Sequence, residues 1–219
     1  MDHRHDRGDQ IRDHMRRHHP RLDFWHGHSN WARWRYNRPY RWATWAALGG
    51  WWGWGNSQPI YYDYGQGGNV YYEGDNVYVD GEVAATAEAY TDSAYDLAEA
   101  GSAAQPTEVK EGEWMSLGVF AVADQEKGDP NMFLQLAVNK DGVISGSYYN
   151  ESTENSQTVQ GSVDKTTQRA AWTIGNNKNT VFDTGIYNLT KDETQVLVHF
   201  GKEKTQTWFL VRMEDPEAK

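Results

Sequence analysis

The sequence contains no cysteine, and this absence removes several classes of protein at once. Disulfide frameworks, thiol catalysis and cysteine-ligated metal sites all need residues that the 219-residue chain does not have. No apolar run approaches the roughly 20 residues of a membrane-spanning helix. No charged-then-apolar leader follows Met1, so we expect no secretory signal in the chain as given. GxSxG, HExxH and phosphate-loop patterns are also missing, which favours a protein that is not an enzyme.

Charge is strongly one-sided in each part of the chain. Residues 1–43 have ten Arg and no Lys against five Asp, a formal charge of +5, while residues 44–219 sum to −15. Such a split indicates a tail and a body with different solution behaviour. Residues 1–22, the basic tail, have few large apolar side chains, so we expect them to be disordered or weakly helical. An acidic body either repels nucleic acid or attracts the basic tail to itself.

Tryptophan is concentrated just after the basic tail. Eight of the eleven Trp lie between residues 24 and 54, which we call the Trp-rich segment. Trp42 and Trp45 are spaced for one face of a short helix, which Gly49-Gly50 is expected to end. The spacing therefore predicts a helix within this segment.

The following residues predict a hairpin and a second helix. Residues 69–81 repeat a β-branched and aromatic pattern around a Glu-Gly-Asp turn, which is typical of a β-hairpin. Residues 84–100 are rich in Ala and Glu without Pro or Gly, and they predict a helix. We therefore expect an aromatic-rich α/β segment over residues 23–110, with a linker at its end.

Residues 112–215 predict a barrel. Runs of alternating character are separated by short turns, at 114–123, 131–139, 142–150, 156–164, 167–175, 180–189, 193–201 and 205–213. Short connections make neighbours in sequence neighbours in the sheet. We therefore predict a mainly β protein with a C-terminal eight-stranded antiparallel up-and-down barrel. Its interior either fills with side chains or holds one small ligand.

Several blocks of the chain resemble one bacterial family. RPYRWATWAALGGWWGWG, NVYYEGDNVYVDGEVAATAEAY, FLQLAVNKDGVISGSYYN and VDKTTQRAAWTI are similar to blocks of the planctomycete mu-protocadherin-like cell-surface proteins. The resemblance implies an extracytoplasmic protein, at the cell surface, in the periplasm or secreted. Its expected role is non-catalytic, as a structural or interaction protein of the envelope.

The predicted barrel also resembles the calycin and avidin-like fold. DGVISGSY at residues 141–148, AWT at 171–173 and TGIY at 184–187 are similar to strand signatures of the avidin family. This resemblance implies that Tyr148 and Trp172 occupy positions of ligand contacts. Asp183 stands where that family has a pocket Trp, so biotin is not the expected ligand.

A second hypothesis makes the barrel a carrier of a small apolar ligand. Tyr148, Trp172 and Trp208 would then line its pocket. Bulky side chains pointing inward would favour a packed scaffold, whereas an open interior would favour the carrier. A register error of one residue reverses which side chains point inward.

The interleaving of arginine with tryptophan suggests a surface that contacts a polymer. The candidate residues are Trp31, Trp34, Arg35, Arg38, Trp42 and Trp45. Guanidinium groups pair with anions and aromatic rings stack on bases or sugars, so the partner is an envelope polymer, a glycan or an anionic surface. A glycan-binding module using these Trp and the Tyr-rich residues 61–78 is a third hypothesis. The acidic body argues against nucleic acid.

Metal binding and catalysis are not expected. The histidines of the basic tail could ligate zinc, nickel or copper, but a metal site needs fixed geometry, so we predict no metal and no cofactor. Asp183 and Glu193 are expected to be solvated carboxylates at a barrel rim. His199 is the one histidine within the predicted barrel.

Overall fold

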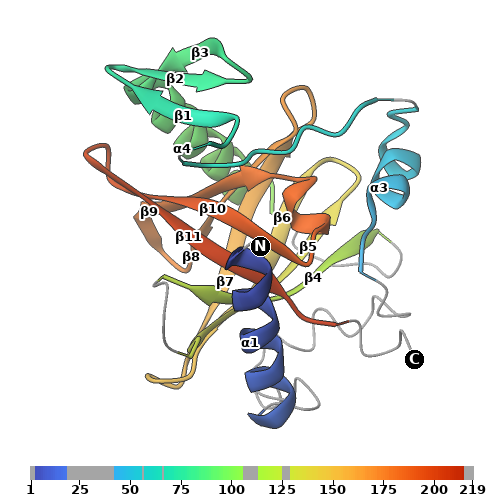
Figure 1. Ribbon diagram of the computed structural model, residues 1–219. Coiled ribbons are helices and arrows are strands. Elements are labelled where there is room, and N and C mark those ends of the chain that lie inside the picture. Colours follow the sequence, from blue (N-terminus) through green and yellow to red (C-terminus); the bar gives the residue numbers. More distant parts are fainter. Residues whose placement is uncertain are drawn as a thin grey trace.

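A computed structural model describes residues 3–18, 42–55, 57–65, 67–105, 113–124 and 129–214. Its centre is a closed antiparallel barrel of eight strands, which confirms the predicted mainly β fold (Figure 1). The barrel strands are β4 (Trp114–Ala123), β5 (Met132–Asn139), β6 (Val143–Asn150), β7 (Asn155–Asp164), β8 (Arg169–Ile174), β9 (Asn177–Gly185), β10 (Glu193–Phe200) and β11 (Lys204–Arg212). A single 3-10 turn, η2 (Asn188–Thr190), lies between β9 and β10.

Each barrel strand pairs with its neighbour in sequence, as the short turns predict. The barrel closes where β11 pairs with β4, from Phe209 opposite Ala123 to Arg212 opposite Phe120. We call this ladder the seam. Near it, the register of β4 shifts at Gly118, whose φ of 134° is unfavourable for any residue with a Cβ.

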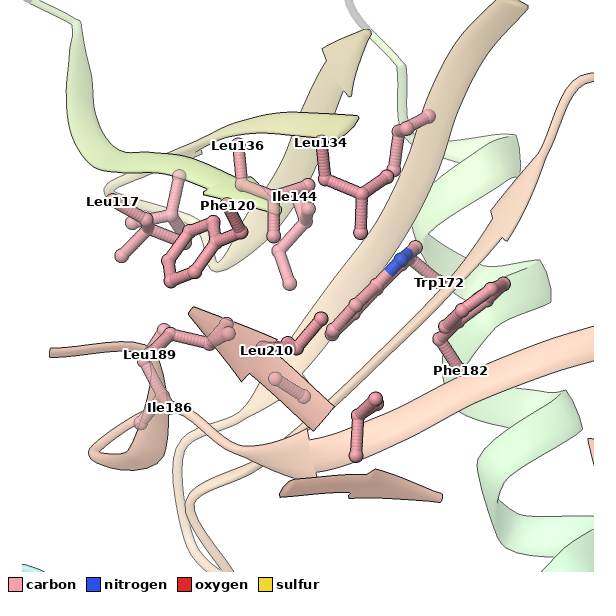
Figure 2. Close-up of a cluster of buried hydrophobic side chains, with 14 of the residues drawn as sticks. Leu117, Phe120, Leu134, Leu136, Ile144, Trp172, Phe182, Ile186, Leu189 and Leu210 are labelled. Carbon is pink, nitrogen blue, oxygen red and sulfur yellow. The ribbon is translucent and has the colours of Figure 1, made fainter. Parts of the chain in front are cut away.

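Alternate residues of the strands point inward and fill the barrel. Leu134, Leu136 and Ile144 are completely buried there, together with Trp172 and Leu210. Figure 2 shows these side chains converging from strands on opposite sides of the barrel. The barrel interior is therefore filled with side chains, which is the first of the two alternatives expected from the sequence.

The outer wall of the barrel is covered over much of its surface. Phe133 and Ala137 of β5 point away from the barrel interior, yet they are 0% and 2% exposed. Helix α1 (His3–His18) covers Phe133, whereas Trp114 and Val143 cover Ala137. Helix α4 (Ala87–Ala103) covers a different part of the wall, on β8 and β9. Outward-facing positions of this barrel are therefore not equivalent to solvent-exposed positions.

Residues 3–18 of the basic tail form helix α1, so the structure has the helical one of the two alternatives expected for the tail. Ile11 and Met15 are 1% and 2% exposed and pack against the seam. Basic side chains of α1 meet acidic partners from the body: Arg4 contacts Asp63 at 2.6 Å, and Arg12 and Arg16 contact Glu193 and Glu214. The acidic body attracts the tail, and burial of two apolar side chains supports its order.

A three-stranded sheet and helix α4 form a side module against the barrel (Figure 1). Its strands are β1 (Val70–Glu73), β2 (Asn76–Val79) and β3 (Glu82–Thr86), paired in that order. Helix α4 begins at Ala87 rather than at residue 84, because the preceding residues extend the sheet and the Thr86 hydroxyl caps the helix by accepting from the Ala89 amide at 3.1 Å. Helix α4 packs so closely on β7 that Gly101 faces the backbone of Gly161.

Helix α3 (Trp45–Trp52) covers one end of the barrel. It continues past the predicted stop at Gly49-Gly50 and ends at Gly53, which is left-handed with a φ of 69°. The guanidinium of Arg212 connects three segments at this end of the barrel, because it donates hydrogen bonds to the carbonyl oxygens of Leu117, Thr190 and Ala43. Among the described helices, none is both long and apolar enough to span a membrane.

Candidate functional site

The three predicted ligand contacts all lie in or against the barrel interior. Trp172 is fully buried and stacks on Phe182, with ring centroids 5.7 Å apart and planes within 9° (Figure 2). Trp208 meets the same Phe182 edge-on at 5.7 Å. Tyr148 is partly buried, and its hydroxyl accepts a hydrogen bond from the Asn150 amide at 3.2 Å. These three residues therefore belong to one cluster of packed side chains, in which Phe182 contacts both indoles.

One atom in this cluster is chemically unsatisfied. Among the residues that the structure describes, the buried Nε1–H of Trp172 has no hydrogen-bond acceptor. Buried donors without acceptors are rare in folded proteins, and each one calls for an explanation. This donor is the feature of the interior that points most directly to a ligand.

Two of the six predicted polymer contacts lie within the described residues, and both pack against the barrel. The Trp42 indole donates to the carbonyl oxygen of Met213 at 2.7 Å. Trp45 packs against Trp54 and Tyr187, with ring centroids 5.1 and 5.4 Å apart. Trp42 and Trp45 are partly buried as a result. The other four, Trp31, Trp34, Arg35 and Arg38, lie outside the described residues.

The sequence does not reveal the main polar cluster of the molecule, which is buried beneath α4. Asp183 and His199 are 0% exposed and Arg169 is 9% exposed, all on the outer wall of the barrel. Asp183 is therefore not the solvated rim carboxylate that the sequence suggests. The physical reason is the side module, which covers this part of the wall.

Arg169 is the centre of this cluster. Its Nη2 donates to Asp183 Oδ2 at 2.6 Å, and its Nε donates to Oδ1 at 3.3 Å. Its Nη1 donates to the Ser93 hydroxyl at 2.6 Å, and its guanidinium carbon lies 3.8 Å above the ring of Tyr90. Because Ser93 and Tyr90 belong to α4, the arginine connects the helix to the barrel wall.

A polar chain leads from this cluster towards the surface. His199 Nε2 faces Asp183 Oδ2 at 3.5 Å, and its Nδ1 lies 2.9 Å from the hydroxyl of Thr205. Thr205 is exposed, and its side chain lies close enough to that of Tyr72, from strand β1, to favour a lower pKa of the Tyr72 hydroxyl. We call Arg169, Asp183, His199, Thr205 and Tyr72 the polar chain. It links four barrel strands, β8 to β11, to the side module.

The ionisation of the cluster follows from its geometry. Burial alone would raise the pKa of Asp183, but the charge of Arg169 and hydrogen bonds from His199 and Arg169 outweigh it and lower that pKa. Burial likewise opposes the charge of Arg169, yet Asp183 raises the pKa of the guanidinium. The cluster therefore contains an ion pair at neutral pH.

The buried tyrosines around the ion pair are neutral. Burial raises the pKa of Tyr62 to about 12, and it raises the pKa values of Tyr64 and Tyr90 well above their ordinary value of 10.0. Partial burial also raises the pKa of Tyr72 to about 12. These hydroxyls are donors or acceptors rather than bases in the neutral range.

The polar chain lies between two hollows. The first has a volume of about 700 Å³ and lies between α4 and the barrel, so we call it the α4 hollow. Its walls include the apolar side chains of Ile60, Val79 and Leu97, and Arg169 lies among its lining residues. Both its size and its mainly apolar wall are typical of sites for small molecules.

The second hollow lies between the β1–β2 hairpin and strands β10 and β11, and we call it the hairpin hollow. Its volume is about 480 Å³. Tyr72 and Tyr64 line it from the side module, and Leu197 and Thr207 line it from the barrel. Tyr72 thus belongs both to this hollow and to the polar chain.

Glu193 is also not the solvated carboxylate expected from the sequence. Its side chain is 14% exposed and contacts the guanidinium of Arg12 and, at 3.2 Å, His5 Nδ1. Asp9 completes a group of three residues that could ligate a metal ion. Arg12 contacts both carboxylates, however, so these residues form an ion-pair cluster around its guanidinium.

Comparisons of the chain with known proteins find no significant similarity. No family model matches the chain, and no curated protein or solved structure is significantly similar to it. Evidence on the function of this protein therefore comes from its geometry and its sequence.

Proposed function

We propose that this protein is a non-catalytic component of the bacterial cell surface, in which the barrel is a filled scaffold and the segments around it contact an envelope partner. The observation that carries the proposal is the packing of the barrel interior. Phe120, Leu136 and Trp172 are each completely buried there, and they occupy the volume in which a carrier would hold its ligand.

The charge distribution supports an envelope polymer over nucleic acid as partner. Arg4, Arg12 and Arg16 form ion pairs with the acidic body, so these cations are already neutralised. The blocks that resemble planctomycete cell-surface proteins support an extracytoplasmic location. Trp31, Trp34, Arg35 and Arg38 stay the predicted polymer contacts.

The proposal is tested by sedimentation of the purified full chain with isolated planctomycete envelopes. We expect the wild-type protein to sediment, and the quadruple variant W31A/W34A/R35A/R38A to bind at least about tenfold more weakly. The variant K178A/K202A loses two exposed cations elsewhere and should bind as the wild type does. A wild-type chain that stays in the supernatant would overturn the proposal.

The carrier hypothesis has one observation in its favour, the unpaired indole N–H of Trp172. Tyr148 and Trp208 are only partly buried, so a small ligand with an acceptor group would contact them before reaching that donor. Native mass spectrometry of the full chain distinguishes the two functions. A filled scaffold gives the mass of the chain alone, whereas a carrier retains an adduct of fixed mass that the variant Trp172→Phe binds less well.

A further inference from the structure

We infer that the hairpin hollow is a binding site for an uncharged sugar residue of a glycan. The inference rests on the proposed function in one respect, since it supplies the chemical class of the envelope partner. It differs in place, because the hollow lies between the side module and the barrel, whereas the predicted Trp and Arg contacts lie between residues 31 and 45.

The lining of the hollow sets the charge of the ligand. It consists of Tyr64, Gly65, Gly67, Val70, Tyr71 and Tyr72 with Leu197 and Thr207, and none of these side chains is charged. A charged ligand would lose hydration without gaining a counter-charge, which is costly. The whole chain also has a net charge of −10, which disfavours acidic polymers. The ligand should therefore be neutral.

An aromatic ring is available for stacking at the edge of the hollow. Tyr72 is 42% exposed, and only it and Val83 are exposed large apolar side chains among the described residues. Its hydroxyl lies close to the side chain of Thr205, whose own hydroxyl is 2.9 Å from His199 Nδ1. The ring therefore lies beside the polar chain, and a side chain with fewer accessible orientations loses less conformational entropy on binding.

Two glycines give the ligand access to the backbone. Gly65 and Gly67 have φ values of 99° and 83°, which side chains rarely tolerate, and a Cβ at either position would meet nothing within 4 Å. The backbone therefore borders open space here, as it does where a chain approaches a ligand closely. Thr207 lines the hollow from the barrel.

These features together fit a sugar ring better than other neutral molecules. A sugar ring has an apolar C–H face that stacks on an aromatic side chain, and hydroxyl groups that bond to backbone and threonine groups. The volume of about 480 Å³ is within the range of about 300–1,000 Å³ for small-molecule sites.

Isothermal titration calorimetry of the full chain tests the inference, with cellohexaose, chitohexaose and mannohexaose as probes. We expect saturable binding of at least one of them. Tyr72→Ala should weaken it by about tenfold or more, while Tyr72→Phe, which keeps the ring, should retain most of the affinity. Val83→Ala removes the other exposed apolar side chain of the same sheet and should bind as the wild type does.

Three results would overturn the inference: no saturable binding of any probe at about 5 mM, unchanged affinity in Tyr72→Ala, or tighter binding of an oligogalacturonate. If Tyr72→Ala does not fold, ring-labelled tyrosine in the wild-type chain replaces it. NMR should then show the Tyr72 resonance, assigned with Tyr72→Phe, shifting as the probe saturates, and an unmoved resonance counts against the site. Failure here leaves the envelope sedimentation unaffected, so the two proposals fail separately.

Discussion

Arg169 Nη2 lies 2.6 Å from Asp183 Oδ2 on the outer wall of the barrel, where α4 covers both residues. The arginine also donates to the carbonyl oxygen of Tyr90 at 3.2 Å, so one guanidinium joins strands β8 and β9 to the side module. The attachment of α4 therefore depends on a buried charge pair as well as on apolar packing.

We expect Asp183→Asn to destabilise the fold by about 3–5 kcal/mol, because it leaves the Arg169 charge buried without its counter-charge. Urea unfolding at neutral pH measures this difference. The double variant Arg169→Met/Asp183→Leu removes both charges and should lose less stability than the single variant. A single variant within about 1 kcal/mol of the wild type would contradict the assigned role of the pair.

Asp183 should also contribute to acid unfolding. Its pKa in the folded state lies below the ordinary value of 3.8, so its stabilising contribution is present above pH 3.8 and is lost as the pH falls through the lower folded value. We expect urea titrations between pH 7 and 2 to show a loss of stability in this acid range that is smaller in Asp183→Asn. Equal acid sensitivity of the wild type and Asp183→Asn would contradict this contribution of Asp183.

Gly101→Ala should destabilise the contact between α4 and β7. The added Cβ would overlap the carbonyl group of Gly161, and overpacking of this kind costs about 1–3 kcal/mol. Gly50→Ala is the matched control, since that helix position has nothing within 4 Å of a Cβ. The control should gain about 0.5–1 kcal/mol. Thermal unfolding of the two variants should therefore shift in opposite directions.

Trp172→Ala should cost about 3–5 kcal/mol, because it opens a cavity in the filled barrel interior. Trp208→Ala should cost less, since Trp208 is only partly buried. Chemical unfolding followed by circular dichroism gives both values. A barrel that tolerates Trp172→Ala without loss would show that its interior is not packed as described.

His5 should titrate above its ordinary pKa of 6.5, because a hydrogen bond and the negative charge of Glu193 favour its protonated form. Since the pKa is raised in the folded state, this contact stabilises α1 below pH 6.5 and is lost as the pH rises through the folded value. NMR titration of the His5 ring measures the midpoint. In Glu193→Gln the midpoint should return towards 6.5, and an unchanged midpoint would rule out the contact.

The barrel is predictable from local pattern, whereas the polar cluster is not. Leu134 and Leu136 alternate with Phe133 and Gln135, and this alternation specifies a strand and its inward face. The sequence predicts Asp183 to be a solvated carboxylate at the rim, which is wrong, because Asp183 lies buried on the outward face beneath α4. Local pattern cannot show that residues 87–103 fold back over that face, because nothing in the neighbouring residues records a contact made so far along the chain.

The candidate site was difficult to predict for a similar reason. From the sequence, Tyr72 is one residue of a predicted hairpin and Thr205 is one residue of a predicted strand. Their proximity joins positions far apart in sequence, so local pattern does not reveal it. Helix α1 was also difficult to predict. Ile11 and Met15 are too few apolar residues to indicate an ordered helix unless the surface against which they pack is known. One useful signal was the excess of acidic residues in the body, because it indicated that the body would attract the basic tail.

Helix α1 contacts both strands of the seam, and this has a consequence for biosynthesis. Ile11 and Met15 pack against Val119 from β4 and Val211 from β11, so their binding surface is complete only after β11 has emerged from the ribosome. At about 5–20 residues per second, roughly 10–40 s pass between the synthesis of the helix and that of its last contact. The nascent chain must therefore keep two apolar side chains soluble on their own for that time, and only the arrival of the final strand allows the first helix to dock.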